Sequence, residues 1–151
     1  MIKALTENFG ILIGSIDGEE YFTFPTIDRL AQNDVESKLR DLKFGYRAKF
    51  IQQAAIYLKS RFKDSNEIYE LRKSSYKEVF NELVKVPGIG NKVADCICLM
   101  SFHKFQAVPI DTHVLSIASN TYNFKEVKQN GKNKTITNKN YLEIGKKKST
   151  S

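Results

Sequence analysis

The stretch from Leu83 to Asp95, Leu-Val-Lys-Val-Pro-Gly-Ile-Gly-Asn-Lys-Val-Ala-Asp, is the feature that most constrains how this chain can fold. Proline stops a helix because it lacks an N–H and its ring clashes with the preceding turn. Glycine adopts backbone angles that a β-carbon forbids, and it lets another backbone come close. We therefore predict that Pro87, Gly88 and Gly90 form a tight hairpin between two helices.

Apolar residues recur at helical spacing on both sides of this hairpin. We expect Ser75 to cap the first helix and Asn91 to cap the second. The expected apolar faces are Tyr76, Val79, Phe80, Leu83 and Val84 in the first helix, and Val93, Cys96, Ile97 and Met100 in the second. Unpaired N–H groups at the start of the second helix, together with its dipole, favour an anion such as phosphate. An ordinary turn between two core helices is the alternative, which the glycines alone would favour.

Two polar residues add chemistry to the hairpin. Lys92 lies in the first turn of the second helix, where the dipole disfavours a cation, so its amine should lose its proton readily and serve as a nucleophile. Asp111 follows Pro109 and Ile110 and precedes another helical pattern, so it is well placed as a helix N-cap. A solvated lysine and a purely structural cap are the alternatives. Together the two residues supply the amine and the carboxylate needed to attack a sugar carbon in DNA.

At these residues the chain resembles the helix-hairpin-helix Gly/Pro-Asp DNA glycosylases, and within them the 8-oxoguanine DNA glycosylases. The resemblance rests on residues 86–100 and 106–113, and residues 18–25 and 44–50 share it. It implies an all-α helix-hairpin-helix domain over residues 1–124. It also implies a bifunctional base-excision repair enzyme, which removes 8-oxoguanine and then cleaves the strand as an abasic-site lyase by β-elimination. A non-enzymatic DNA-binding fragment or pseudo-enzyme is the alternative.

The same resemblance implies a catalytic pair and a base pocket. Lys92 would form a Schiff base with C1′ of the damaged nucleoside, and Asp111 would stabilise the positive charge that develops on the sugar. Cys96 and Met100 would line the pocket for the damaged base. A buried core thiol is the alternative for Cys96.

DNA contacts and a cation site are implied in the same way. The implied DNA-binding residues are Tyr46, Arg47, Gly88, Gly90, Val93 and His113. Tyr46 would act as a wedge in the opposite strand, and Arg47 would read the estranged cytosine. A solvated helix start and a water-exposed histidine are the alternatives for these side chains. Backbone carbonyls would hold a monovalent cation, and they belong to Val84, Val86 and Ile89.

Comparison with the family pattern also predicts a chain truncated at both ends. The family has an amino-terminal β-rich domain and an asparagine that fills the gap left by the flipped base, and neither is found in this sequence. At the other end we miss a helix that carries a base-stacking phenylalanine and a base-reading glutamine. We therefore expect an incomplete helical domain.

Charge and length agree with a DNA partner. The chain has 151 residues and a net charge of +7, and its pI is near 9.3, which favours an acidic partner such as double-stranded DNA with an oxidised purine or an abasic site. Basic surfaces that serve only solubility are the alternative. No stretch approaches about 20 apolar residues, so we expect no membrane span. We expect a monomer.

Cysteine usage bounds the cofactors and the compartment. Cys96 and Cys98 lie two residues apart on one predicted helix, so they point to different faces and are unsuited to a disulfide. Only His103 and His113 remain as further ligands, so we expect neither a zinc site nor an iron–sulfur cluster. Reduced thiols favour the cytosol or nucleus. The family resemblance favours the nucleus, with the mitochondrion as the alternative.

Outside the hairpin, which spans residues 75–102, most of the chain is predicted to be helical. Thr26 should cap a short helix to Gln32, and Asn33 or Asp34 should cap another to Leu42. Before these helices we expect an irregular segment with an extended piece at 11–13, and after them a short helix from Asn66. An amphipathic helix is expected over 46–62, and its inward residues are Phe50, Ile51, Ala54, Ala55, Leu58 and Phe62. The Lys/Asn-rich tail over 125–151 is predicted to be disordered.

Overall fold

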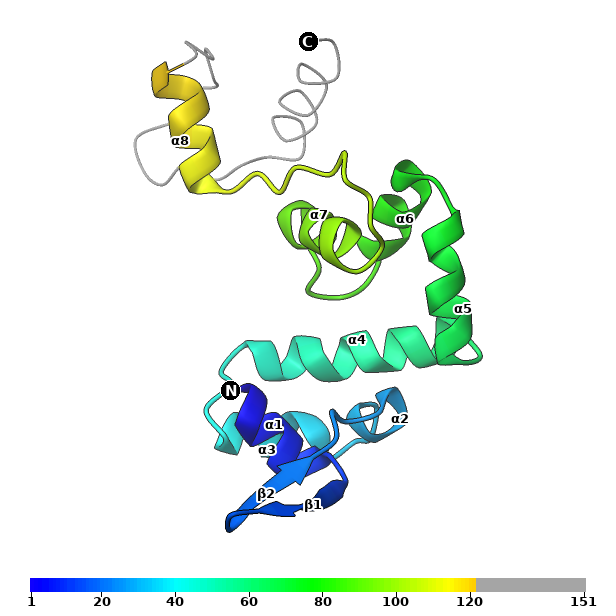
Figure 1. Cartoon of the computed structure of the whole chain (residues 1–151), viewed down its shortest axis with the longest axis vertical. Helices are drawn as coiled ribbons and strands as arrows, with labels where there is room; N and C mark the ends of the chain where they lie inside the picture. The colour runs from blue at the N-terminus through cyan, green and yellow to red at the C-terminus, as the bar shows by residue number, and fades with distance from the viewer. Residues whose placement is uncertain (122–151) are drawn as a thin grey trace. The chain divides into compact units, whose positions relative to one another are not determined.

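The computed structural model describes residues 1–121, which form a mostly helical protein (Figure 1). Two compact units make up the chain. Unit 1 comprises Met1–Glu70 together with Lys85–Gly88, and unit 2 comprises Leu71–Val84 and the described residues from Ile89 onward. The helical class predicted from the sequence is confirmed. The tail predicted over 125–151 lies outside the described residues.

Unit 1 contains five helices and a small sheet among its described residues. In chain order its elements are α1 (Ile2–Phe9), β1 (Leu12–Ile16), β2 (Glu19–Phe22), α2 (Ile27–Leu30), α3 (Val35–Asp41), α4 (Arg47–Arg61) and α5 (Ser65–Glu70). Helix α4 packs against both α2 and α3. It therefore forms the support on which the short helices of this unit rest.

The helix starts in unit 1 differ in part from the predicted ones. Thr26 caps α2 as expected, because its hydroxyl accepts a hydrogen bond from the Arg29 N–H at 3.2 Å. Asp34 occupies the N-cap position of α3 but makes no side-chain cap bond. Its carboxylate instead binds Arg29 and Lys38, whose hydrogen bonds lower its pKa to about 2. Helix α5 begins at Ser65 rather than at Asn66.

Strands β1 and β2 pair antiparallel where an irregular segment was expected. The turn residues Asp17 and Gly18 have φ values of 52° and 82°, which a two-residue hairpin turn of this hand requires. Every residue of β1 is exposed, so the strand has no buried face to produce an apolar and polar alternation. The predicted extended piece at 11–13 is therefore the beginning of a complete hairpin.

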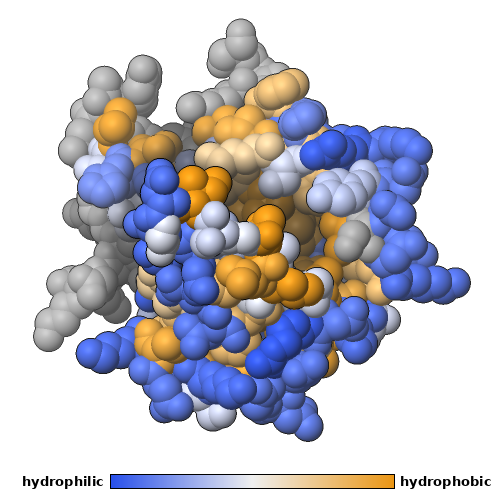
Figure 2. Space-filling model, turned by 60° about the horizontal axis from the view of Figure 1, so that its bottom comes forward, coloured by the Kyte–Doolittle hydropathy of each residue, from blue (hydrophilic) through white to orange (hydrophobic). Residues whose placement is uncertain are grey.

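The core of unit 1 is mainly apolar, with the polar side chain of Gln52 also buried. Its buried cluster comprises Leu5, Phe9, Leu30, Val35, Leu39, Phe44, Ala48 and Ala55. The predicted inward face of α4 is partly wrong, because Ala48, Gln52 and Ala55 are buried while Phe50 is 41% exposed. Figure 2 shows hydrophobic side chains exposed among hydrophilic ones on the surface. Helix α4 thus directs its small residues Ala48 and Ala55 toward the core, so that α2 and α3 pack close to it.

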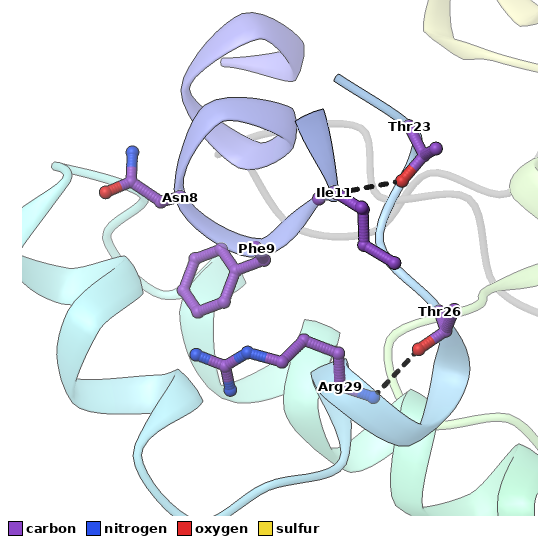
Figure 3. Close-up of a pocket in the computed structure, with 7 residues that line it drawn as sticks. Asn8, Phe9, Ile11, Thr23, Thr26 and Arg29 are labelled. Atoms are coloured by element: carbon purple, nitrogen blue, oxygen red, sulfur yellow. Dashed lines mark hydrogen bonds between the residues drawn. The ribbon is translucent and has the colours of Figure 1, made fainter. Parts of the chain in front are cut away.

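A pocket of about 250 Å³ lies between the end of α1 and the start of α2 (Figure 3). Thr23 accepts a hydrogen bond from the Ile11 N–H at 3.0 Å, and Thr26 accepts one from Arg29. The Arg29 guanidinium lies 4.9 Å from the centre of the Phe9 ring and binds Asp34. The polar side chains Thr23, Thr26 and Arg29 that line the pocket thus form bonds within the protein, which indicates a structural role for this pocket.

Unit 2 contains the predicted hairpin helices. Its elements are a 3₁₀ turn η1 (Leu71–Lys73), α6 (Tyr76–Leu83), α7 (Asn91–Met100) and α8 (Thr112–Thr121). Ser75 caps α6 as expected, and Glu78 completes a capping box by accepting the Ser75 N–H at 2.8 Å. Among the residues whose burial the structure describes, the buried apolar residues of this unit are Val79, Leu83, Ala94, Cys98, Phe102, Ala107 and Ile110.

Two predictions about α7 are wrong. The N-cap position is occupied by Gly90, and Asn91 is the first residue of the helix. The buried face consists of Ala94, Asp95 and Cys98, whereas the predicted inward residues Val93 and Met100 are 43% and 73% exposed. Small residues on the buried face let α6 approach α7 closely. The larger apolar side chains are left on the outside of the helix.

Over residues 1–121 no helix is both long and apolar enough to cross a lipid bilayer.

Candidate DNA-binding and catalytic site

The two glycines of the hairpin differ in what they contribute. Gly88 has a φ of +85°, in the left-handed region that favours glycine. A β-carbon on it would lie 2.8 Å from Cβ and 2.9 Å from Cγ of Phe50. Gly90 has an ordinary φ of −91°, and a β-carbon there would meet nothing within 4 Å. The predicted need for glycine angles is therefore confirmed at Gly88 and wrong at Gly90.

The turn itself begins before Pro87. Helix α6 ends at Leu83, and its last carbonyls are partly satisfied by the Val84 N–H, which binds the Phe80 carbonyl at 3.1 Å. Val86 is 4% exposed and belongs to unit 1, while Val84 and Ile89 belong to unit 2. The cation site predicted on these three carbonyls stays a prediction.

Lys92 is the second residue of α7 and is exposed to solvent. Among the described residues its amine has neither a hydrogen bond nor an ion pair. The first N–H of α7 that bonds to a preceding carbonyl is that of Ala94, which binds Gly90 at 2.9 Å. The backbone N–H groups of Lys92 and Val93 thus have no partner in the described part of the chain. An amine and open N–H groups stand together at this helix start.

Asp111 caps α8, as the sequence predicts. Its Oδ1 atom accepts hydrogen bonds from the backbone N–H groups of His113 at 3.0 Å and Val114 at 2.9 Å. The Val114 hydrogen bond is the largest cause that holds the pKa of this carboxyl below its ordinary value of 3.8. The nearby charge of Lys92 also lowers that pKa. Oδ2 has no hydrogen-bond partner within residues 1–121, so the carboxylate combines a capping oxygen with an open one.

The predicted pocket residues follow Lys92 along one stripe of α7. Cys96 and Met100 lie four and eight positions after it, so the three side chains share a helix face. Cys96 is half-buried and Met100 is exposed. Cys98 lies on the opposite, buried face, where burial raises the pKa of its thiol to about 11 and keeps it protonated. Both cysteines are free thiols, as expected.

A buried polar network in unit 2 was not predicted. Asp95 is 1% exposed, and its Oδ1 accepts a hydrogen bond from the Tyr76 hydroxyl at 2.6 Å. Burial and the Asp95 carboxylate raise the pKa of Tyr76 well above its ordinary value. The Lys104 amine donates to the carbonyls of Arg72 and Ser74 at 2.7 and 2.6 Å. These bonds tie the segment after α7 to the start of α6 and hold the helix that carries Lys92.

The predicted opposite-strand residues belong to unit 1, at the start of α4. Tyr46 is 67% exposed, and the Arg47 guanidinium lies 4.9 Å from the centre of its ring. The structure thus places Tyr46 and Arg47 together as an exposed aromatic and cationic pair. Lys92, Asp111 and His113 lie in unit 2, where the His113 side chain is exposed.

Metal-binding side chains are not clustered in the described region. No group of three or more His, Cys, Asp or Glu side chains within residues 1–121 is arranged to hold a metal ion.

Comparison with known proteins extends this picture. The chain is 39% identical over 155 residues to the N-glycosylase/DNA lyase of Saccharomyces cerevisiae, a match that covers 98% of this chain and 41% of that protein. It is 41% identical over 114 residues to the N-glycosylase/DNA lyase OGG1 of Arabidopsis thaliana, with 75% and 31% covered. This chain thus spans less than half the length of both relatives.

The fold agrees with a solved structure as well. The crystal structure of the Clostridium acetobutylicum 8-oxoguanine glycosylase/lyase, in complex with double-stranded DNA containing cytosine opposite 8-oxoguanine, superimposes with a TM-score of 0.74 at 27% identity. This alignment covers 97% of our chain and 46% of the other. A sequence model for the HhH-GPD superfamily of base excision DNA repair proteins matches residues 1–141. The chain therefore belongs to the HhH-GPD superfamily of base excision DNA repair proteins.

Proposed function

We propose that this chain carries the catalytic half of a DNA glycosylase with abasic-site lyase activity. The observation that carries the proposal is the presence of an amine, Lys92, and a carboxylate, Asp111, within unit 2. The Lys92 amine is exposed and unpaired among the described residues, and its charge is among the causes that lower the pKa of Asp111. A free amine near an ionised carboxylate, beside open N–H groups, suits attack on a sugar carbon that carries a phosphate on each side.

In the proposed reaction, Nζ of the neutral Lys92 amine forms a bond to C1′ as the bond from C1′ to the base breaks. The base leaves with the electron pair and takes up a proton. The nitrogen then loses a proton, the bond from C1′ to O4′ opens, and O4′ takes up a proton, which leaves a protonated Schiff base. The Asp111 carboxylate stabilises the positive charge on the sugar.

Strand cleavage would follow from the same intermediate. Loss of a proton from C2′ lets the electron pair expel the phosphate at C3′, so the bond from C3′ to oxygen breaks by β-elimination. Water then hydrolyses the Schiff base and frees the Lys92 amine. An abasic site has already lost its base, so there Nζ of Lys92 bonds to C1′ and the C1′ hydroxyl leaves as water. Schiff-base formation and β-elimination then follow as described.

The proposed substrate is 8-oxoguanine in double-stranded DNA. This rests on the named activity of the Clostridium protein in its DNA complex and on the OGG1 relative. The target base must leave the stack to reach Lys92. Cys96 and Met100 would then face it, because they share the stripe of α7 that follows the lysine. The proposed compartment is the nucleus.

Phosphate contacts would come from the hairpin and from the start of α8. The open N–H of Val93 and the absence of a β-carbon at Gly90 let a phosphate approach the start of α7. His113 supplies an exposed side chain at the start of α8. Tyr46 and Arg47 would engage the opposite strand. Carbonyls at the hairpin would bind a monovalent cation, whose charge offsets that of the phosphate.

Borohydride trapping on a duplex with an abasic site tests this proposal. Wild-type protein should form a covalent complex, because borohydride reduces a Schiff base to a stable amine. Lys92→Gln should abolish the complex and leave DNA binding largely intact, since it removes the nucleophile alone. Lys77→Gln is the matched control, because Lys77 is an exposed lysine of α6 in the same unit.

Equal trapping by the Lys92→Gln variant would remove Lys92 from its proposed role. Tight DNA binding by the wild-type chain without any trapping would favour the second candidate, a DNA-binding fragment without catalysis.

A further inference from the structure

We propose that Phe50 is a positioning residue that couples the opposite-strand pair, Tyr46 and Arg47, to the hairpin turn at Gly88. The inference deepens the proposed function and rests on it, since it takes these residues as DNA contacts. All four residues belong to unit 1, so their arrangement is described within one compact unit.

The first contact joins Phe50 to the hairpin turn. The positions Cβ, Cγ and Cδ1 of Phe50 would lie 2.8, 2.9 and 3.2 Å from a β-carbon on Gly88. The ring and its stem therefore occupy the space that any other residue at position 88 would need. Gly88 has a φ of +85°, so the turn needs glycine for its backbone angle as well. The close packing of Phe50 holds this turn from one side.

The second contact joins Phe50 to Tyr46. The two rings meet edge to face, with centroids 6.3 Å apart and planes at 82°, which is a favoured arrangement of aromatic rings. They lie four residues apart on α4, so the helix itself brings them together. The Arg47 guanidinium lies over the Tyr46 ring at 4.9 Å. A continuous set of contacts thus runs from Arg47 through Tyr46 and Phe50 to Gly88.

The helix that carries these rings is firmly anchored. Ala48, Gln52 and Ala55 are buried on the inward face of α4, and the Gln52 side chain donates a hydrogen bond to the Gln32 carbonyl. Phe50 points away from that face and is 41% exposed. A large aromatic residue that leaves so much surface in water adds little to the core. The contacts of Phe50 with Gly88 and Tyr46, rather than packing in the core, therefore explain its role.

This arrangement has a consequence for DNA binding. A Tyr46 ring that wedges into the opposite strand presses on Phe50, and Phe50 in turn supports the turn that leads to the phosphate contacts. Phosphate binding on one DNA strand and insertion into the other strand are then coupled. Loss of Phe50 should weaken binding and also reduce the part of the affinity that depends on Tyr46.

Binding of a fluorescent abasic duplex by anisotropy, with cytosine opposite the site, tests this coupling. We expect Phe50→Ala to raise Kd about tenfold, the scale of one lost aromatic contact. The trapping rate at saturating DNA should change by less than about twofold, since Lys92 is untouched. Phe50→Tyr keeps the ring and should restore Kd. Ile56→Ala, at another exposed apolar position of α4, is the control and should bind like wild type.

Tyr46→Ala combined with Phe50→Ala completes the test. If the two residues act together, Tyr46→Ala should weaken binding much less in the Phe50→Ala background than in wild type. Purely additive effects would overturn the proposal, and so would a Kd for Phe50→Ala equal to that of wild type. Phe50→Leu keeps an apolar side chain without the ring, so it replaces the alanine variant if circular dichroism shows that Phe50→Ala is unfolded.

The binding readout separates this inference from the proposed function. Wild-type protein that binds DNA with the expected Phe50 dependence but is not trapped by borohydride would refute the catalytic proposal alone. Efficient trapping without any Phe50 dependence of Kd would refute the coupling alone.

Discussion

The two units of this protein are stabilised in different ways. Unit 1 has a contiguous apolar core, and its largest fully buried side chain is Leu39. Unit 2 has a smaller set of apolar residues and buries a carboxylate, Asp95, against the Tyr76 hydroxyl. Polar bonds from Lys104 to the carbonyls of Arg72 and Ser74 close the same unit. Unit 1 buries the neutral Gln52 against the Gln32 carbonyl, whereas the unit that carries the proposed nucleophile buries a carboxylate and adds the two Lys104 bonds.

This difference indicates different roles for the two units. Apolar packing is nondirectional and tolerates small shifts, whereas a hydrogen bond at 2.6 Å fixes both distance and angle. Asp95 lies one helical turn after Lys92, so a bond that fixes Asp95 also limits rotation of α7 about its axis. We infer that unit 1 supplies stability and that unit 2 supplies the orientation of the amine.

The largest effect on stability is expected from the core of unit 1. Leu39→Ala removes a side chain that is 0% exposed, which should cost about 2–5 kcal/mol in the free energy of unfolding. Urea denaturation measures this directly. Leu12→Ala is the matched control, since Leu12 is 52% exposed in β1 and its loss should cost less than about 0.5 kcal/mol. Similar costs at both positions would show that the assigned core is wrong.

A smaller effect is expected in unit 2. Tyr76→Phe removes only the hydroxyl that binds Asp95, and loss of one hydrogen bond to a carboxylate should cost about 1–3 kcal/mol. Tyr21→Phe, at a half-exposed position in β2, is the control and should leave the free energy of unfolding unchanged. The same urea denaturation, followed at neutral pH, measures both variants.

The pH dependence of stability gives a second measurement on Tyr76. Its pKa is raised in the folded protein above the ordinary value of 10.0. The folded state therefore keeps the phenol proton at pH values where the unfolded chain has lost it, and stability should fall as pH rises above 10. Tyr76→Phe should remove that part of the alkaline loss. An unchanged alkaline slope in the variant would show that folding does not raise the pKa of Tyr76.

The two hairpin glycines, where the two units meet in sequence, are expected to differ in their effects on stability. Gly88→Ala forces a β-carbon into the left-handed region and against Phe50, which should cost about 1–2 kcal/mol or more. Gly90→Ala has an ordinary φ and open space, so the fold should be affected by less than about 1 kcal/mol.

DNA binding should nevertheless depend on Gly90. A methyl group there would obstruct the approach of phosphate, so Gly90→Ala should weaken binding to all sequences alike and should reduce its salt dependence. Anisotropy titrations at several salt concentrations, on two unrelated duplexes, measure both quantities. Wild-type affinity in the Gly90→Ala variant would exclude a phosphate at this position.

Local chemistry made some features predictable from the sequence. Ser75 and Asp111 were identified as caps because a side-chain oxygen before a helical pattern has few other uses, and both caps are present. The prediction for the buried face of α7 is wrong because helical periodicity gives most weight to large apolar residues, whereas this helix buries Ala94 and Cys98. The Tyr76–Asp95 bond joins residues 19 positions apart, and no periodic pattern shows such a pairing.

The β1–β2 hairpin was not predicted from the sequence, for a different reason. Its turn signal, Asp17-Gly18, is present in the sequence, since both residues tolerate positive φ. All of β1 is exposed, so the alternation that normally marks a strand is absent. Tertiary contacts such as the packing of Phe50 on Gly88 also escaped prediction, because they depend on how separate segments meet in space.

Mass spectrometry of the trapped complex can identify the residue that attacks C1′, which we propose to be Lys92. The wild-type chain would be incubated with an abasic duplex and borohydride, digested with nuclease and protease, and the peptide that carries the sugar remnant sequenced. We predict that the remnant lies on Nζ of Lys92. A remnant on another lysine, or on the amino terminus, would contradict it.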